Sequence, residues 1–135
     1  MSTSVTDRIQ SFLALDSFAV VGASIDRSKY GNKVLRCYQQ HGKEVYPINA
    51  RAAEVEGLKA YPSLASLPVQ VKAISIITPP AITEMVVREA AAAGVTHVWM
   101  QPGAESDTAI REAKALGLSV IAEGPCLLVV MGYHE

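Results

Sequence analysis

Short apolar segments alternate with longer amphipathic segments along almost the whole chain. Runs of about five apolar residues are typical of strands buried on both faces of a sheet, and apolar residues at helical spacing fill the segments between them. We expect this alternation to fold as an α/β protein, a doubly wound parallel sheet of about five strands with helices on both faces. The predicted strands are 18–21, 43–48, 73–78, 96–100 and 118–122, and the predicted helices are 4–15, 28–41, 79–93 and 106–116.

Local signals refine the helices. Ser4 and Asp7 stand in the relation of a capping box before the first helix. Thr78 is placed to cap the third helix, in whose first turn the missing N–H groups of Pro79 and Pro80 cost little. The residues of that helix expected to face the core are Ile82, Met85, Val86, Ala90 and Ala93.

Two segments carry weaker patterns. We expect 50–67, which contains Gly57 and Pro62, to be a connection with at most a short strand and a helical turn. The apolar segment 124–130 fits either a short helix or an edge strand. Neither segment breaks the alternation that defines the sheet.

Length and composition fit a single domain. Half of the 135 residues are hydrophobic, enough for one sizeable core, so we expect 1–135 to be one domain with 1–17 packed on it as an N-terminal helix. Cys37 and Cys126 have no C-x-x-C spacing, which fits a reducing compartment. No apolar run reaches about 18 residues and no secretory signal is recognisable, so we expect a cytoplasmic protein without a membrane span.

The turn after the first predicted strand is the strongest candidate site. Gly22, Ala23 and Ser24 form a tight small-residue turn before a helix start, where backbone N–H groups can meet a phosphate. In a parallel sheet all strand-to-helix turns share the carboxyl edge, where ligands bind. The other turns expected at that edge are 49–51, 78–80 and 101–103.

The end of the second strand distinguishes among nucleotides. An NAD site usually has G-x-G-x-x-G at the first turn and an acid after the second strand, and this chain has neither. Arg51 instead suits a phosphate ester on the ribose, as in NADP or 3′-phospho-ADP, because a guanidinium binds phosphate oxygens in a bidentate manner.

The positive charge that would favour a phosphate ligand is found in one segment and not in the sequence as a whole. The 12 Lys and Arg nearly balance the 13 Asp and Glu, so no global field favours nucleic acid or an anionic membrane. Segment 26–51 holds six Lys or Arg against two acids, a local charge of +4. That excess fits either an ordinary solvated helix face or a site for a multiply charged small anion.

Catalytic groups are scarce. The three histidines lie apart in sequence, Ser24 has no G-x-S-x-G context, and no His/Cys/Asp cluster has metal-ligand spacing. We therefore expect no catalytic and no metal-binding residues. Whether Cys126 or Glu123, at the end of the last strand, has a chemical role stays open.

Several motifs in order resemble one family. The segments 20–24, 29–34, 45–49, 56–58, 61–64, 94–101 and 117–118 are similar to those of the stand-alone CoA-binding proteins and of the CoA-binding domains of the succinyl-CoA synthetase α subunit and ADP-forming acyl-CoA synthetases. The likeness covers about 18–126 and implies a Rossmann-like fold that binds CoA or an acyl-CoA.

The resemblance also implies site residues. It places the CoA pyrophosphate on the first turn and helix start, the nucleotide phosphate near Arg51, the adenine and ribose beside 78–80, and the pantetheine arm near 100–102. Segments 78–80 and 101–103 depart from the pattern of related stand-alone members, which bears on the adenine contacts. The expected CoA-binding residues are Gly22, Ala23, Ser24, Ile25, Ser28, Lys29, Tyr30, Asn49, Arg51, Thr78, Pro79, Pro80, Gln101 and Pro102.

Three hypotheses follow for the function. The first is non-catalytic binding of CoA or acyl-CoA, because the synthetases' phosphohistidine domain and grasp module are missing from the sequence. The second is an NADP-binding oxidoreductase or nucleotide-sensing domain that uses the same turns. The third is a structural domain that binds a protein partner, and a homo-oligomer stays possible under each.

Overall fold

A parallel sheet organises residues 4–135, which the computed structural model describes; residues 1–3 of the expected domain lie outside the described part. Its strand order is β2-β1-β5-β6-β7 and every neighbouring pair is parallel. The expected doubly wound α/β fold is therefore confirmed. The strands are β1 (Ser17–Val21), β2 (Glu44–Ile48), β5 (Ala73–Ile76), β6 (His97–Met100) and β7 (Ser119–Ile121).

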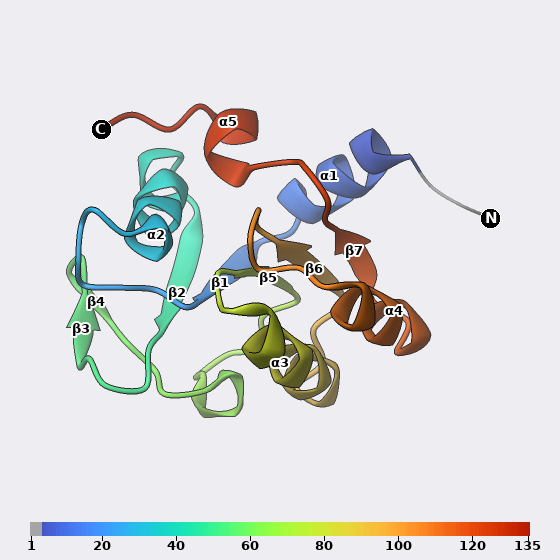
Figure 1. Ribbon diagram of the computed structural model, residues 1–135. Helices are drawn as coiled ribbons and strands as arrows, with labels where there is room; N and C mark the ends of the chain where they lie inside the picture. The colour runs from blue at the N-terminus through green and yellow to red at the C-terminus, as the bar shows by residue number, and fades with distance from the viewer. Residues whose placement is uncertain (1–3) are drawn as a thin grey trace.

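Helices cover both faces of this sheet (Figure 1). One face carries α1 (Val5–Leu13), α2 (Tyr30–Gln40) and α5 (Leu127–Met131). The other carries α3 (Pro80–Ala92) and α4 (Asp107–Ala115). Successive strand residues point to opposite faces and meet one helix layer each, so the strands are buried on both sides.

The first face holds the aromatic half of the core. Phe12 of α1 packs edge-on against Trp99, and Phe18 stacks on Tyr38 of α2 at a ring distance of 4.9 Å. The buried Tyr38 hydroxyl has a partner in Ser75 at 2.7 Å, which offsets the cost of desolvating both groups. The second face is filled by aliphatic side chains and alanines.

The third helix begins later than expected, and the role of Thr78 as its cap is wrong. Pro79 is the N-cap and Pro80 the first helical residue, with no side-chain hydrogen bond to the cap. The Thr78 hydroxyl instead pairs with that of Thr83 at 2.7 Å.

The core-facing side of this helix also differs from the expectation. Val86 and Ala90 are buried, but Ile82 and Met85 are 45% and 52% exposed. Thr83 takes the inward position, since its hydroxyl bonds with Thr78 and with the Pro79 carbonyl and so can be buried without an unmet polar group.

The irregular segment carries more structure than expected. The strands β3 (Glu54–Val55) and β4 (Leu58–Lys59) pair as an antiparallel hairpin, and Leu64–Ser66 forms a 3₁₀ turn, η1. The hairpin turn uses the left-handed conformation at Glu56 and Gly57. The apolar segment after β7, for which two forms were open, contains the short helix α5.

Candidate functional site

The turn after β1 lies at the point where the winding of the sheet reverses. The chain passes from β1 outward to β2 and then returns across β1 to β5, so the carboxyl ends of β1 and β5 flank the switch point. In open α/β sheets this is where ligands bind. Gly22 follows β1 and Thr78 follows β5, so two of the expected turns meet there.

Two glycines let this turn pack tightly. Gly22 has φ +98°, and a Cβ built on it would lie 2.0 Å from the Ile77 carbonyl oxygen. Gly31, in the first turn of α2, would place a Cβ 2.0 Å from the Gly22 carbonyl oxygen. No side chain fits at either position without moving backbone, so the turn, the end of β5 and the start of α2 are locked together.

Two asparagines fix the next peptide groups. Asn49, after β2, donates from Nδ2 to the Ala23 carbonyl at 2.8 Å. Asn32 of α2 donates from Nδ2 to the Ser24 carbonyl at 2.8 Å. With both carbonyls held by the protein, the orientation of the turn is set before any ligand arrives.

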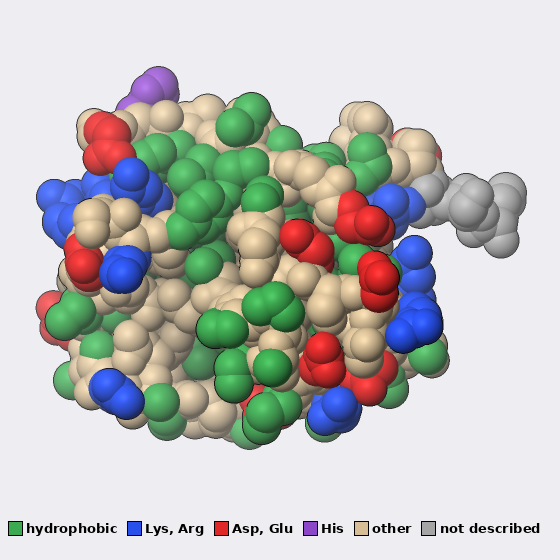
Figure 2. All heavy atoms as spheres, viewed as in Figure 1, with side chains coloured by type: hydrophobic (Ala, Val, Ile, Leu, Met, Phe, Trp, Pro, Cys, Tyr) green, Lys and Arg blue, Asp and Glu red, His purple; other side chains and the backbone are tan. Residues whose placement is uncertain are grey.

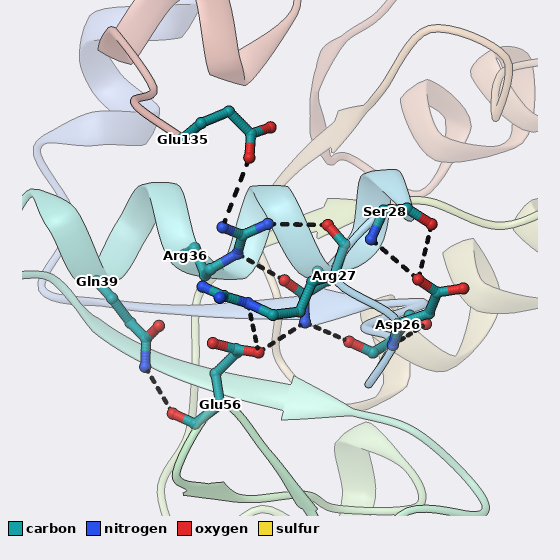
Figure 3. A network of polar contacts seen from close by, with 9 residues as sticks. Asp26, Arg27, Ser28, Arg36, Gln39, Glu56 and Glu135 are labelled. Carbon is teal, nitrogen blue, oxygen red and sulfur yellow. Dashed lines mark hydrogen bonds and ion pairs between the residues drawn. The ribbon is translucent and has the colours of Figure 1, made fainter.

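A buried polar network supports the turn from α2 (Figure 3). The fully buried Asn32 accepts from Arg36 Nε at 2.7 Å, and Arg36 donates from Nη2 to the Arg27 carbonyl at 2.9 Å. Asn32 also donates to the Glu56 carboxylate at 3.0 Å, and Arg27 lies 3.5 Å from the same carboxylate. The network ties the turn and its following loop to the β3–β4 hairpin.

The loop between the turn and α2 has its own hydrogen bonds. Ser24 Oγ accepts from the Asp26 backbone N–H, and Asp26 accepts from both the N–H and the hydroxyl of Ser28. The hydrogen bonds from Ser28 lower the pKa of the Asp26 carboxyl. Ile25, Ser28 and Lys29 are exposed, and Lys29 is the N-cap of α2 without a side-chain hydrogen bond to the cap.

A cleft of about 330 Å³ brings together the start of α2 and the segments after two strand ends. Tyr30, the first residue of α2, lines it together with the segments after β5 and β6. The lining residues are Tyr30, Ile77, Thr78, Pro79, Pro102, Gly103 and Ala104.

A second group of polar atoms lies next to this cleft. The Tyr30 hydroxyl donates to Gln101 Oε1 at 3.2 Å and contacts the Cys126 sulfur. Gln101 Oε1 also accepts from the Leu127 N–H at 2.9 Å. Gln101 is fully buried, and its Nε2 has no hydrogen-bond partner within residues 4–135.

Arg51 lies at the margin of the site. Its backbone N–H donates to Asn49 Oδ1 at 2.8 Å, and its side chain is exposed. Asn49 therefore connects Arg51 to the turn after β1, although Arg51 does not line the cleft. Pro80 lies one residue beyond the cleft, at the start of α3.

The local basic excess has two parts in the structure. Figure 2 shows Lys and Arg side chains gathered over α2 and the β3–β4 hairpin, with acidic side chains among them. Arg27 pairs with Glu56, and Lys33 and Arg36 face Glu135. These three cations therefore support the fold, whereas Lys29 and Arg51 are exposed at the carboxyl edge.

Sequence reasoning missed the supporting residues. Asn32, Arg36 and Glu56 fall in motifs that look ordinary, and only their long-range contacts show what they do. A signal was present for Gly31 and Asn32, because a glycine and an asparagine in the first turn of a helix are poor helix formers.

A family model agrees with this site. The model for a family described as CoA binding domain matches residues 16–132. The chain belongs to this CoA-binding domain family.

Among known proteins, this chain is similar to parts of larger ligases and to whole short chains. It is 32% identical over 127 residues to the α subunit of an ADP-forming acetate–CoA ligase II from Pyrococcus furiosus, and 28% identical over 126 residues to an ADP-forming acetate–CoA ligase from Methanocaldococcus jannaschii. These matches cover 86% and 87% of this chain but 27% and 18% of the ligases. The chain thus corresponds to a minor part of each ligase.

Solved structures of short chains match over nearly their whole lengths. A conserved hypothetical protein from Pyrococcus furiosus is 39% identical with a TM-score of 0.80, covering 86% of this chain and 99% of that one. A hypothetical protein from Pyrococcus horikoshii OT3 is 28% identical with a TM-score of 0.87, covering 95% and 89%. The Rossmann-like fold is shared with both.

Two further findings concern residues 4–135. No helix in this part of the chain is both long and apolar enough to cross a bilayer. Within the same residues, no three His, Cys, Asp or Glu side chains are grouped so that they could hold a metal ion.

Proposed function

We propose that the chain binds CoA or an acyl-CoA at the carboxyl edge of the sheet, without itself catalysing a reaction. The observation that carries the proposal is the junction of Gly22, Gly31 and Ile77, where two glycines let the turn after β1 pack directly against the end of β5 and the start of α2 at the switch point. Membership of the CoA-binding domain family supports CoA as the ligand.

The phosphates have a suitable place at this junction. The first N–H groups of α2 lack a side-chain cap, and the exposed Lys29 precedes them. A helix N-terminus attracts anions through its free N–H groups and its dipole. We assign the pyrophosphate to Gly22, Ala23, Ser24 and the segment 25–30, with Lys29 supplying charge.

The 3′-phosphate and the pantetheine arm of CoA have places on opposite sides of the turn after β1. On one side Asn49 and Arg51 lie beyond the turn, and Arg51 supplies a guanidinium for the 3′-phosphate. On the other side the cleft of about 330 Å³ runs along the ends of β5 and β6 and suits the pantetheine arm. Thr78 and Pro79 line this cleft, and Pro80 follows them at the start of α3.

The non-catalytic part of the proposal rests on what the chain corresponds to. It spans 27% and 18% of the two ligases, and the site we propose is made mainly of turn backbone and of side chains suited to binding phosphates. Holding CoA for another protein, or responding to its concentration, requires nothing more than this site.

Calorimetric titration with five nucleotides tests the proposal. CoA and acetyl-CoA should bind, dephospho-CoA should bind more weakly, and NAD and NADP should not bind at similar concentrations. A ligand at one hundred times its Kd stabilises the folded state by about 2.7 kcal/mol, so thermal unfolding provides an independent check. Binding of NADP without binding of CoA would refute the proposal and favour the oxidoreductase or sensing alternative.

A further inference from the structure

Cys126 lies in a polar cluster that the binding of nucleotide phosphates does not use. The cluster joins three segments distant in sequence, since Tyr30 opens α2, Gln101 follows β6 and Cys126 follows β7. Tyr30 contacts both other residues and also lines the cleft. The half-buried thiol is therefore one side chain away from the cleft.

Gln101 indicates that this cluster accepts a ligand. Its side chain is fully buried and its Oε1 accepts from the Tyr30 hydroxyl, yet its Nε2 has no acceptor within residues 4–135. Burying an amide donor without an acceptor costs about 1–3 kcal/mol. A carbonyl oxygen brought by a ligand would remove that cost, and a pantetheine arm carries two such carbonyls.

The arm is long enough to reach the thiol. Neighbouring strands lie about 4.8 Å apart, so the turn after β1 and the end of β7, three strands further along, are separated by roughly 14 Å. Pantetheine has about twelve bonds between its phosphate ester oxygen and its sulfur, which extend to roughly 14 Å at the dimensions of a peptide backbone. A ligand whose phosphates lie at the start of α2 can thus bring its sulfur to Cys126.

We propose that Cys126 is a thiol–disulfide exchange site for oxidised CoA. The Cys126 thiolate attacks the CoA sulfur of a CoA disulfide, the Sγ–S bond forms as the original S–S bond breaks, and the electron pair leaves with the departing thiolate. That thiolate takes up the proton lost from Cys126. A free thiol attacking the mixed disulfide later reverses the step.

Tyr30 can stabilise the attacking thiolate. Burial, with the hydrogen bond to Cys126 next in size, raises the pKa of Tyr30, so its hydroxyl stays protonated across the physiological range. The hydroxyl now donates to Gln101, and on loss of the Cys126 proton it can turn to donate to Sγ.

Mass spectrometry of the whole protein tests the inference, which rests on the proposed CoA site. The protein is incubated with CoA disulfide or with glutathione disulfide, which has no nucleotide. We expect one CoA adduct, located on Cys126, to form at least tenfold faster than the glutathione adduct. Equal rates, no adduct, or an adduct on Cys37 would overturn the inference.

Substitutions of Cys126, Cys37 and Tyr30 distinguish the roles of these residues in the exchange. Cys126→Ser should abolish the adduct. Cys37→Ala should not change its formation, because Cys37 is a fully buried residue of α2. Tyr30→Phe keeps the ring but removes the hydroxyl that would donate to the thiolate, and it should slow exchange several-fold at neutral pH but much less at high pH. A pH-independent loss would assign Tyr30 only a packing role and overturn that part.

Calorimetry with reduced CoA in the presence of a reductant distinguishes this inference from the proposed function. A protein that binds reduced CoA but gains no adduct overturns only the exchange site. A protein that does not bind reduced CoA refutes the proposed function, and equal modification by both disulfides would then show an ordinary accessible thiol.

Discussion

At the scale of single residues, Gly22 determines how closely β1 and β5 approach each other at the switch point. Gly22→Ala combines a strained φ of +98° with a Cβ 2.0 Å from a carbonyl oxygen. We expect the free energy of unfolding to fall by about 3 kcal/mol or more in urea denaturation. Gly42→Ala is the matched control, because Gly42 has φ +68° but open space around its Cβ, and should cost about 1 kcal/mol. Equal losses would mean that backbone strain alone matters.

The proposed site gives Arg51 the contact with the 3′-phosphate that distinguishes CoA from its dephosphorylated form. We expect Arg51→Ala to raise the Kd for CoA by about tenfold or more, because a charged hydrogen bond contributes about 1.5–3 kcal/mol, and to change that for dephospho-CoA much less. Lys114→Ala, in the last turn of α4, removes a positive charge elsewhere on the surface and should leave both constants unchanged. Isothermal titration with both ligands measures this, and parallel losses would refute contact with the 3′-phosphate.

Residues that act locally could be identified from the sequence, and those that act across the fold could not. Ser4 caps α1 as expected, because a cap depends on residues three apart. The role of Asn32 depends on Ser24 and on Glu56, 24 positions away. Whether the expected site residues bind CoA stays a prediction.

At the scale of elements, α2 is held to the loop before it and to the C-terminal tail through Arg36. This side chain is 8% exposed, binds Asn32 and the Arg27 carbonyl, and lies over the Tyr133 ring. We expect Arg36→Ala to lower the free energy of unfolding by about 2–4 kcal/mol, because it leaves buried polar groups unpaired.

Lys33 provides the matched control for Arg36. Both side chains face Glu135, at 3.1 Å from Lys33 and 3.9 Å from Arg36, but the side chain of Lys33 is 32% exposed and that of Arg36 only 10%. Lys33→Ala should therefore cost about 0–1 kcal/mol. If chemical denaturation gives the same loss for both variants, the buried contacts of Arg36 contribute nothing and the ion pair with Glu135 explains the whole effect.

Helix faces were less predictable than helix positions. Hydrophobicity favoured Ile82 and Met85 as inward residues of α3, but the buried stripe is Thr83, Val86, Val87 and Ala90. A threonine can replace a bulky apolar residue in the core when its hydroxyl is satisfied nearby, and that condition is invisible in the sequence. The predicted buried face of α3 was therefore rotated about the helix axis, whereas the predicted position of the helix in the sequence was nearly correct.

At the scale of the whole molecule, the sheet was predictable because strand burial and short connections leave few topologies open. The two faces of the sheet carry separate clusters of buried side chains, which confirms the predicted arrangement of a sheet between two helix layers. The β3–β4 hairpin was not predictable, because two-residue strands leave no periodicity to detect. The same hairpin supplies Glu56 to the network behind the site, so the missed element and the missed residues have one cause.

The pH dependence of stability is a property of the whole fold, to which His97 contributes at the start of β6. Burial lowers the pKa of His97, so below about pH 6.5 the unfolded chain binds this proton more readily than the folded protein does. The free energy of unfolding should therefore be unaffected by His97 above about pH 6.5 and should fall as the pH drops below it. Urea denaturation between about pH 8 and pH 5 measures this, since the Asp26 and Glu135 carboxyls, whose pKa values are lowered, stay ionised there.

His97→Gln isolates the contribution, because glutamine keeps a polar side chain beside Thr96, whose hydroxyl lies 2.7 Å from His97 Nδ1, and does not titrate. The variant should lose stability less steeply than the wild type as the pH falls from about 6.5 to about 5. A wild-type slope in His97→Gln would mean that His97 gains its proton equally in the folded and unfolded states, because only a difference in proton binding makes stability depend on pH.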